Sequence, residues 1–297
     1  MDRSDLAERM KGYEKRNRYY LQRRMPVILR LDMRAGHSFT KGFKRPFDEI
    51  FIKSMQSTAK YLCENIQNCK LSYQQSDEIT LLLVDYDKLD TDCFFDYRVD
   101  KLCSITASMA AMAFNKFFEK YVDEYRFSKW DGVSKYEDGT WGYIQTLLNA
   151  VDKGAMFDAR CFNIPKEEVT NLIYWRQLDA SRNSIQMVGQ ANFSHKELQN
   201  KSCNDIQDML MIQKGINWND LPTCQKRGSC CIKEEYAVNS NDVNSNDEEV
   251  EVDYITDVDE PVESVTFKSR WIIDTDIPIF KGEDREYIDR LVFIGEK

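Results

Sequence analysis

Three carboxylic acids at two places in the chain have the right chemistry for a magnesium site. Asp32 follows a short apolar run with β-branched members at residues 25–31, which we interpret as a buried strand. Asp77 and Glu78 lie in a polar turn between two further strand-like runs. Carboxylates at adjacent strand ends supply the hard oxygen ligands that Mg²⁺ prefers, and magnesium supports in-line displacement at phosphorus. Ser76-Asp77-Glu78 taken alone is more typical of an ordinary turn.

Basic residues near these acids fit a phosphate-bearing substrate. Arg30 and Arg34 flank Asp32, and the alternation of side chains along a strand places Arg30 on the same face as Asp32. Arg98 and Lys101 lie near the start of a predicted helix, where free N–H groups favour anions. We expect these two residues to grip a triphosphate, with the arginine in forked geometry. The alternative for Arg98 and Lys101 is that they are ordinary solvent-facing helix charges.

The elements around these acids follow the order strand, helix, strand, strand, helix, strand. The predicted strands cover residues 25–31, 70–73, 79–84 and 157–163, and the predicted helices cover residues 48–67 and 94–121. This is the α+β, ferredoxin-like order βαββαβ, which is also the palm of many polymerases. In such a sheet the first strand lies beside the strand that follows the hairpin turn, so Asp32 and Asp77 can meet. The fold alone does not define a function.

The remaining elements suggest a second region. A helix is predicted over residues 2–22, and helices over 166–194 and 202–215 are followed by strand-like pieces near 228–236 and 262–272. We therefore predict a palm catalytic domain over residues 1–164 and a mainly helical C-terminal region with a small hairpin over 165–297. Residues 237–260 are rich in Asn, Asp, Ser and Glu, which indicates a flexible acidic insertion in the hairpin. Mimicry or repulsion of RNA is the weaker alternative for this segment.

The formal net charge of −9 conceals a mildly basic remainder. Residues 234–263 contain twelve acids and no Lys or Arg; subtracting these from the 50 acids leaves 38, against 41 basic residues. Basic residues cluster at positions 11–24 and 41–45, and such patches attract polyanions regardless of total charge. Solvated helix faces explain these clusters equally well.

The cysteines and the N-terminus indicate a cytoplasmic protein. The nine cysteines have irregular spacing, which favours reduced thiols over a disulfide framework or a paired zinc set. A metal site among Cys203, Cys224, Cys230, Cys231 and His195 is the alternative. Ser194 and Glu197 around His195 predict a capped helix start. The N-terminus is charged throughout, unlike a secretory signal, and no apolar run reaches membrane-spanning length.

An ordered set of motifs resembles the tRNA-His guanylyltransferase superfamily, with the closer likeness to its bacterial and viral branch of 3′–5′ RNA polymerases. The set covers nearly the whole chain outside the acidic insertion and is far more specific than any one motif. Its members are ERMKGYE, RLDMRAGHSFT (30–40), RPFDEIF (45–51), QSDEITLLL (75–83), FDAR (157–160), YWRQLDASRNSIQ (174–186), FSHKEL and KGINWNDLP.

The resemblance implies a palm domain with two Mg²⁺ ions, held by Asp32, Asp77 and the backbone carbonyl of Met33, with Glu78 as a further catalytic acid. Nucleotide contacts would come from the loop after the first strand, from the second motif and from the hairpin: Arg30, Asp32, Met33, Arg34, Ala35, Gly36, His37, Arg45, Asp48, Ser76, Asp77, Arg98 and Lys101. RNA contacts would come from FDAR and the later helix: Arg160, Trp175, Arg176, Asp179 and Asn183. The helical C-terminal region would bind RNA, and homo-tetramers or dimers are expected.

The implied reaction adds nucleotides to the 5′ end of tRNA. The 5′-phosphate is activated, usually from ATP, and the 3′-hydroxyl of an incoming nucleotide, typically GTP, attacks it. Met33 and Gln74 replace usual glycines and Gly36 replaces a usual aromatic residue, so we expect these departures to affect nucleotide affinity rather than the metal pair. Ser181-Arg182-Asn183-Ser184 stands at the family's tRNA-His recognition motif. We therefore predict templated repair of 5′-truncated tRNA over strict tRNA-His specificity.

Three other readings of the sequence remain open. A tRNA-His-specific guanylyltransferase would share the whole site. A palm-type nucleotide cyclase would use the same metal pair without an RNA-binding half, and a cyclic nucleotide assay separates it. A non-catalytic RNA-binding module, suggested by Met33 and the acidic insertion, would bind RNA without turnover.

Overall fold

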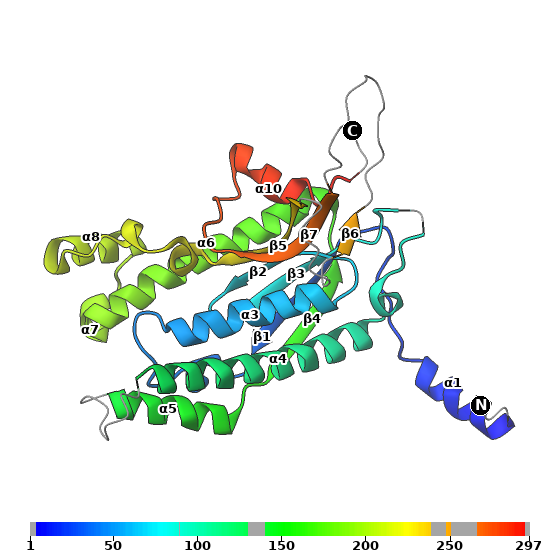
Figure 1. The fold of residues 1–297 in the computed structure, drawn as a ribbon, viewed down its shortest axis with the longest axis horizontal. Coiled ribbons are helices and arrows are strands. Elements are labelled where there is room, and N and C mark those ends of the chain that lie inside the picture. The colour runs from blue at the N-terminus through cyan, green and yellow to red at the C-terminus, as the bar shows by residue number, and fades with distance from the viewer. Residues whose placement is uncertain (1–3, 89, 130–139, 239–247, 251–265, 295–297) are drawn as a thin grey trace.

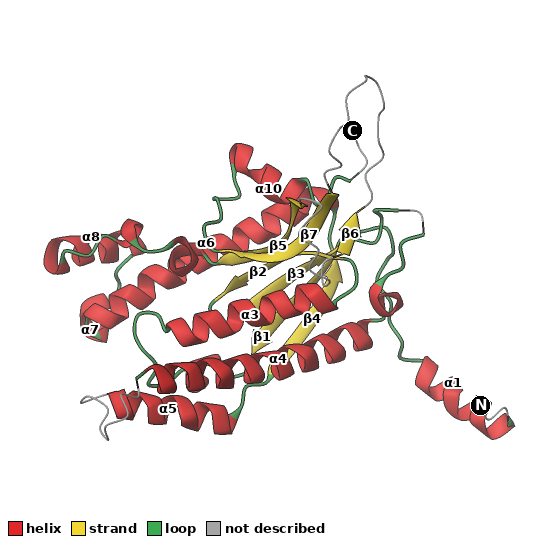
Figure 2. Cartoon of the chain, viewed as in Figure 1, coloured by secondary structure: helices red, strands yellow, loops and turns green. Residues whose placement is uncertain are grey.

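Seven strands form one antiparallel sheet in the order β4-β1-β3-β2-β5-β7-β6. The computed structural model describes residues 4–88, 90–129, 140–238, 248–250 and 266–294. The strand bounds are β1 Val27–Met33, β2 Cys69–Gln75, β3 Glu78–Leu83, β4 Phe157–Asn163, β5 Ser229–Val238, β6 Glu248–Val250 and β7 Thr266–Asp274. Figure 2 shows these strands as a single layer between helices.

The N-terminal half has the predicted ferredoxin-like order. Its two main helices, α3 (Glu49–Asn65) and α4 (Val99–Ser128), connect β1 to β2 and β3 to β4. Strand β1 lies between β3 and β4, antiparallel to both, so the central position expected for the first strand is confirmed. Val27, Ile28 and Leu29 are fully buried because both faces of β1 are covered, which explains its continuous apolar run.

Helices cover both faces of the sheet. Helices α3 and α4 pack on one face, where Leu29 and Leu31 of β1 join Met55 and Phe114 in the larger core. Helix α6 (Lys166–Asn192) crosses the opposite face, where its Ile173 packs with Ile28 of β1. The two faces are distinct in Figure 1, with α6 on one side of the strands and α3 and α4 on the other. Alternate residues of β1 therefore face different helices.

Two helices differ from the sequence predictions. Only Asp5–Lys15 of the helix predicted over residues 2–22 is helical, as α1. Further along the chain Tyr20 forms an antiparallel bridge with Arg98, and this pairing requires an extended backbone. The predicted helix over residues 94–121 is divided into the 3₁₀ turn η1 (Phe94–Tyr97) and α4, because Phe95 and Asp96 have φ values of 50° and 52°. Helix α4 then continues to Ser128.

In the described part of the chain, six helical segments were not among the predicted elements. They are α2 (Gly36–Phe39), α5 (Thr140–Lys153), η2 (Trp218–Asp220), α9 (Thr223–Arg227), η3 (Gly282–Arg285) and α10 (Glu286–Asp289). Helix α5 packs against α4 and buries Ile144 and Leu147. The predicted helix start near His195 is confirmed as α7 (His195–Leu198), with a capping box between Ser194 and Glu197. Helix α8 (Cys203–Lys214) confirms the other predicted helix of this region.

The C-terminal hairpin extends the palm sheet. Strands β5 and β7 pair antiparallel as predicted, and β5 also pairs with β2, so the sheet continues from the N-terminal half into the C-terminal half. The chain ends in η3 (Gly282–Arg285) and α10 (Glu286–Asp289), which pack near α6. The division into domains at residues 164 and 165 stays a prediction.

The predicted acidic insertion falls mostly on positions 239–247 and 251–265, outside the described residues. Its described parts belong to strands: residues 237 and 238 end β5, and β6 pairs with β7. Within the part of the chain that the structure describes, no helix is long and apolar enough to cross a membrane.

Candidate active site

Three acids lie side by side across three strands at the end of β1. Asp32 is directly opposite Glu78 on β3 and Asp158 on β4. Directly opposed residues of antiparallel strands point to the same face. These three residues, which we call the acidic row, therefore share the face that α6 crosses.

Asp77 lies next to the acidic row, in the turn between β2 and β3. Gln75 pairs with Glu78, so Ser76 and Asp77 form a two-residue turn, with Ser76 at a φ of 49°. The N–H of Met33 donates to the carbonyl of Asp77 at 3.1 Å, which ties this turn to the end of β1. The structure brings Asp32 and Asp77 together at one end of neighbouring strands, as the element order predicted.

Gly36 leaves the space that the Asp77 carboxylate occupies. A Cβ added to Gly36 would lie 2.9 Å from Cγ of Asp77 and closer still to Oδ2. Gly36 begins α2, and the preceding Ala35 has the left-handed φ of 56° that turns the chain back from β1. The loop after Asp32 is therefore folded against the side chain of Asp77.

Burial and neighbouring negative charges raise the pKa values of Asp32 and Asp77. The pKa of Asp32 is raised to about 6, first by burial and then by the charges of Asp77, Glu78 and Asp158, while Arg160 opposes the shift. Burial is also the main reason that the pKa of Asp77 is raised, and a hydrogen bond from the Ser76 side chain opposes it. A divalent cation would relieve this repulsion between carboxylates.

The donor set fits magnesium that is shared with a nucleotide. Among the described residues, no three or more His, Cys, Asp or Glu side chains are grouped as a ready-made metal cage. Mg²⁺ does not need one, since it keeps several waters and takes ligands from one or two carboxylates and from substrate phosphates. Asp32 and Asp77 supply such carboxylates, and their crowded charges favour a cation.

Arg30 and Arg160 form a basic pair next to the acidic row, on strands β1 and β4. Arg30 is directly opposite Arg160 of β4, two residues from the acidic row and therefore on the same face. Arg30 donates to Glu78 at 3.2 Å, and Arg160 forms an ion pair of 3.5 Å with Asp158. Acids for a cation and guanidinium groups for phosphate thus occupy adjacent rows of one surface.

Helix α6 brings three of the predicted residues next to the acidic row and the basic pair. Trp175 is 53% exposed and lies beside the guanidinium groups of Arg30 and Arg176, at 5.7 Å and 4.8 Å from its ring. Arg176 is only 4% exposed and forms ion pairs with Glu78 and Asp179. The predicted RNA contact of Trp175 stays a prediction for an exposed ring, whereas Arg176 does not lie on an accessible surface. Arg176 and Asp179 instead hold Glu78 in place.

The structure does not bring Arg98 and Lys101 to the acidic row. The backbone around Arg98 is bonded to residues 19–21, and the N–H of Gln22 donates to Asn163, which is paired with Val27. Strands rise ~3.3 Å per residue, so this end of β1 lies roughly 16 Å from Asp32. Arg98 is instead bonded to Asp100 at 2.7 Å. Within one chain, these two residues lie too far away to share a nucleotide phosphate with Asp32.

Some of the other predicted contact residues are exposed and others are buried. Arg34 and His37 are exposed beside Asp32, and Arg45 is exposed ahead of α3. Asp48 is buried and caps α3: its carboxylate accepts from the N–H groups of Phe51 and Lys44 and from the Tyr143 hydroxyl, so its acceptors are in use. Asn183 is half-buried on α6, more than one turn beyond Asp179.

The departures from the family pattern do not crowd the acidic row. Met33 is 3% exposed and packs in the core under α3 and α4, on the opposite face from Asp32. Gln74 is 4% exposed and pairs with Ser229 of β5. Because it is the strand neighbour of Gln75, which is opposite Glu78, its side chain lies on the other face of the sheet from the acidic row. The expected effect of these side chains on nucleotide affinity therefore cannot come from direct contact at the acidic row.

Asp158 is the site residue that reasoning from the sequence missed. It lies within the FDAR motif, of which only Arg160 was assigned a role. The two-residue spacing of Asp158 and Arg160 in a strand puts both on one face, which was the available signal. Its position opposite Asp32 depends on the strand register, and spacing along the chain does not reveal that register.

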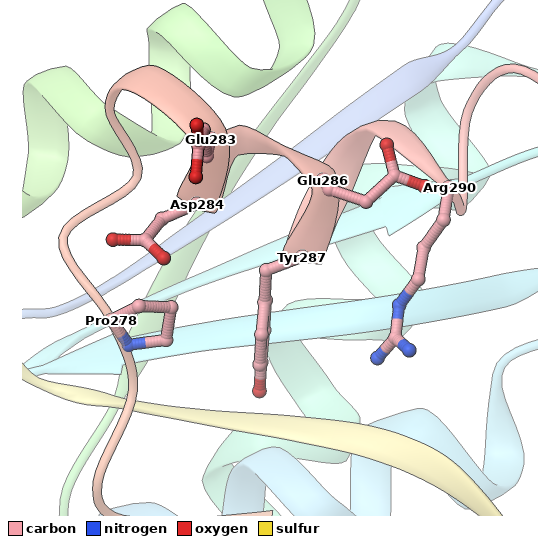
Figure 3. Close-up of a pocket in the computed structure, with 6 residues that line it drawn as sticks. All are labelled: Pro278, Glu283, Asp284, Glu286, Tyr287 and Arg290. Atoms are coloured by element: carbon pink, nitrogen blue, oxygen red, sulfur yellow. The ribbon is translucent and has the colours of Figure 1, made fainter.

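Two further features carry no chemistry of this kind. The nine cysteines are free thiols, as predicted, and Cys203, Cys224, Cys230 and Cys231 form no metal group with His195 among the described residues. The open hollow in Figure 3 is lined by residues of η3 and α10 together with Pro278 and Arg290, and contains none of the predicted site residues. Its three carboxylates, Glu283, Asp284 and Glu286, outnumber the single guanidinium of Arg290 and disfavour a phosphate.

The palm fold, the crowded acids and the neighbouring arginines form a site suited to nucleotidyl transfer. Comparison with known proteins names the family. Residues 7–165 match the family model described as Thg1, tRNAHis guanylyltransferase, so the chain belongs to this family of nucleotidyltransferases.

Similar proteins cover nearly the whole chain. A structure described as a bacterial tRNA(His) guanylyltransferase (Thg1)-like protein in complex with ATP has a TM-score of 0.73 and 38% identity, covering 98% of this chain and 100% of that one. A second structure of that description, in complex with GTP, has a TM-score of 0.71 and 36% identity over the same shares. The tRNA(His) guanylyltransferase of Candida glabrata is 26% identical over 235 residues, 74% of this chain and 88% of that protein.

Proposed function

We propose that this chain is a magnesium-dependent nucleotidyltransferase that adds nucleotides to the 5′ end of tRNA in the 3′–5′ direction. The observation that carries the proposal is the meeting of Asp32 and Asp77, through the pairing of β1 with β3 and the 3.1 Å bond from the N–H of Met33 to the carbonyl of Asp77. Similar structures in complex with ATP and with GTP support nucleoside triphosphates as substrates.

The reaction forms one bond and breaks one bond at the same phosphorus. The 3′-hydroxyl oxygen of the incoming nucleotide forms a bond to the activated 5′-phosphorus of the tRNA, and its proton passes to solvent water. The bond to the activating group breaks, and the electron pair of that bond leaves with the group. Magnesium bound at Asp32, Asp77 and the carbonyl of Met33 would lower the pKa of the attacking hydroxyl and neutralise the leaving group. No side-chain base is required.

The chain's own groups bind and orient the reactants. Arg30 and Arg160 present guanidinium groups for phosphate oxygens on the face of the acidic row. Arg34 and His37, exposed in the loop after Asp32, and the exposed Ser76 would contact the nucleotide. Trp175, with its exposed ring above Arg30, would stack on an unpaired base of the RNA.

We infer that the physiological reaction is repair of 5′-truncated tRNA. The support is the sequence Ser181-Arg182-Asn183-Ser184 on α6, which departs from the motif tied to tRNA-His recognition in the family. Templated addition depends on base pairing within the tRNA, so it needs no protein contact to an anticodon. We further propose that the protein acts in the cytoplasm and assembles as a tetramer or dimer.

The test is nucleotide addition by the purified protein. With Mg²⁺, ATP and all four nucleoside triphosphates, labelled tRNAs lacking one or two 5′ nucleotides should be extended until the acceptor stem is paired. Omitting Mg²⁺ or introducing Asp77→Asn should abolish extension. Extension confined to intact tRNA-His would instead establish a tRNA-His-specific guanylyltransferase, and cyclic nucleotide formation without extension would establish a cyclase. RNA binding without any turnover would show that the protein is a non-catalytic RNA-binding module.

A further inference from the structure

A chain of hydrogen bonds reaches the turn that carries Asp77. Nε2 of Gln74 donates to the carbonyl of Ser76 at 2.9 Å. Oγ of Ser229 donates to Oε1 of Gln74 at 3.2 Å, and Nε2 of Gln56 donates to Oγ of Ser229 at 3.3 Å. These bonds, which we call the Gln74 relay, connect α3 and β5 to the turn between β2 and β3.

Gln74 and Ser229, the two inner members of the relay, are buried, and the donor and the acceptor of each hydrogen bond are defined. Gln74 is 4% exposed and Ser229 is 1% exposed, and the two residues are directly opposed on β2 and β5. Because Gln56 donates to the Ser229 oxygen, the Ser229 proton is free for Oε1 of Gln74, which leaves Nε2 of Gln74 to face Ser76. Buried polar networks in which each member has a partner hold their side chains rigidly.

The start of β5 approaches the end of β2 closely beside Gln74 and Ser229. Gly228 precedes β5 with a φ of 87°, and a Cβ there would lie 2.5 Å from the carbonyl oxygen of Gln74. The hydroxyl of the neighbouring Tyr73 donates to the carbonyl of Arg227 at 2.6 Å. The start of β5 is therefore held closely against the end of β2, which brings Ser229 to Gln74.

The turn needs such support. Ser76 has a φ of 49°, in the left-handed region that residues other than glycine rarely occupy. Ser76 is exposed, so packing does not fix its conformation. The bond from Gln74 restrains its carbonyl, and therefore the peptide unit that leads to Asp77. A small rotation of this peptide would move the Asp77 carboxylate away from Gly36 and Asp32.

We propose that Gln74, oriented by Ser229, is a positioning residue for Asp77 that sets the affinity of the site for its divalent cation. The inference rests on the proposed function, since it assigns to Asp77 the metal-binding role described there. Gln74 and Ser229 touch neither substrate nor metal, because both face α3 on the side of the sheet away from the acidic row. The C-terminal hairpin thereby contributes to the catalytic centre through a side chain of its first residue.

The test measures Mn²⁺ binding by electron paramagnetic resonance, in the presence of GTP, together with the Mg²⁺ concentration that gives half-maximal activity. Gln74→Met keeps the shape of the side chain and removes the amide. We expect it to weaken Mn²⁺ binding about tenfold, the lower end of the effect of removing a residue that orients a metal ligand. Ser229→Ala should act in the same direction with a smaller effect. The double variant should be no weaker than Gln74→Met alone, since both changes break one relay.

Gln177→Met is the matched control. Gln177 is 2% exposed and its amide makes two hydrogen bonds, to the carbonyl of Pro278 at 2.8 Å and from the N–H of Phe280 at 3.1 Å. It is equally buried but has no bond to the turn. We expect this variant to lose thermal stability and to keep the Mn²⁺ affinity of the wild type.

The outcomes separate this inference from the proposed function. Wild-type Mn²⁺ binding that Asp77→Asn abolishes and Gln74→Met leaves unchanged would overturn the positioning role and keep the metal site. Wild-type protein whose Mn²⁺ binding does not depend on Asp77 would overturn the metal site itself. If Gln74→Met does not fold, Ser229→Ala decides, because it removes a single oxygen, and an unchanged affinity in that variant overturns the relay.

Discussion

Asp32 of β1 and Asp158 of β4 are directly opposed, and the pKa of Asp32 is raised to about 6, first by burial and then by the charges of Asp77, Glu78 and Asp158. Both residues lie in the acidic row, so the folded protein without metal holds several negative charges close together. This relationship makes stability depend on pH in a direction that can be predicted.

The first prediction concerns stability without metal. Because the pKa of Asp32 is higher in the folded protein than its ordinary value of 3.8, folding favours the protonated carboxyl. Its contribution is fully present at pH values below 3.8 and is lost as the pH rises through about 6. Asp32→Asn should therefore become more stable relative to wild type as pH increases from about 4 to 8. Thermal unfolding in EDTA across this range measures the difference.

Asp158→Asn is the control for the pH prediction. Removing the opposed charge lowers the pKa of Asp32, so the change in relative stability should move to lower pH. A stability difference between Asp32→Asn and wild type that stays constant with pH would contradict the raised pKa. Adding Mg²⁺ at pH 8 should stabilise the wild type and leave Asp32→Asn nearly unchanged.

The second prediction concerns the space beside Asp77. Gly36→Ala places a methyl group where the Asp77 carboxylate lies, so this side chain must rotate away. We expect at least tenfold weaker Mg²⁺ binding, as for loss of a metal ligand's orientation, with a stability change within about 1 kcal/mol. Mg²⁺ titration of activity and thermal unfolding measure the two effects. Gly12→Ala, in α1 with open space around it, is the control: it should leave Mg²⁺ binding unchanged and raise stability by at most about 1 kcal/mol, because alanine favours a helix.

The third prediction concerns the buried guanidinium on α6. Arg176 is the partner of Glu78 and Asp179, so Arg176→Met leaves two carboxylates without their shared cation. Breaking a buried ion pair from one side costs about 3–5 kcal/mol, and we expect a loss near the lower end because both acids are partly exposed. Chemical denaturation measures it. Arg182→Ala, which removes a 60% exposed partner of Asp179, should change stability by less than about 0.5 kcal/mol.

The fourth prediction concerns the exposed ring on α6. If Trp175 stacks on an unpaired base, Trp175→Ala should weaken binding of 5′-truncated tRNA by about 1–3 kcal/mol, roughly fivefold to more than a hundredfold. Trp175→Phe should keep most of the affinity, because it preserves a ring. Filter binding with nucleotide absent separates this effect from catalysis. Equal affinities for the alanine variant and the wild type would exclude the stacking role.

The sequence by itself determined the order of the palm elements and the two principal acids. Strands β1, β2, β3 and β4 carry dense apolar runs, and α3 and α4 carry apolar faces, so local patterning predicts them. Asp32 and Asp77 were found because each follows such a run in the chain. The break between η1 and α4 and the helix at residues 140–153 were missed because contacts with distant segments, rather than local pattern, decide these conformations. The segment η1 leads into the bridge between Tyr20 and Arg98, and α5 packs on α4.

Only the tertiary structure decided which charges share the site. Strand register, which is set by packing on both faces of the sheet, placed Asp158 opposite Asp32 and Arg160 opposite Arg30. The direction of α4 carried Arg98 and Lys101 to the far end of β1, although a basic pair at a helix start is a reasonable phosphate site in the sequence. The pairing of β2 with β5 brought Ser229 to Gln74 across 155 positions of chain, and no local pattern in a sequence encodes a contact of that range.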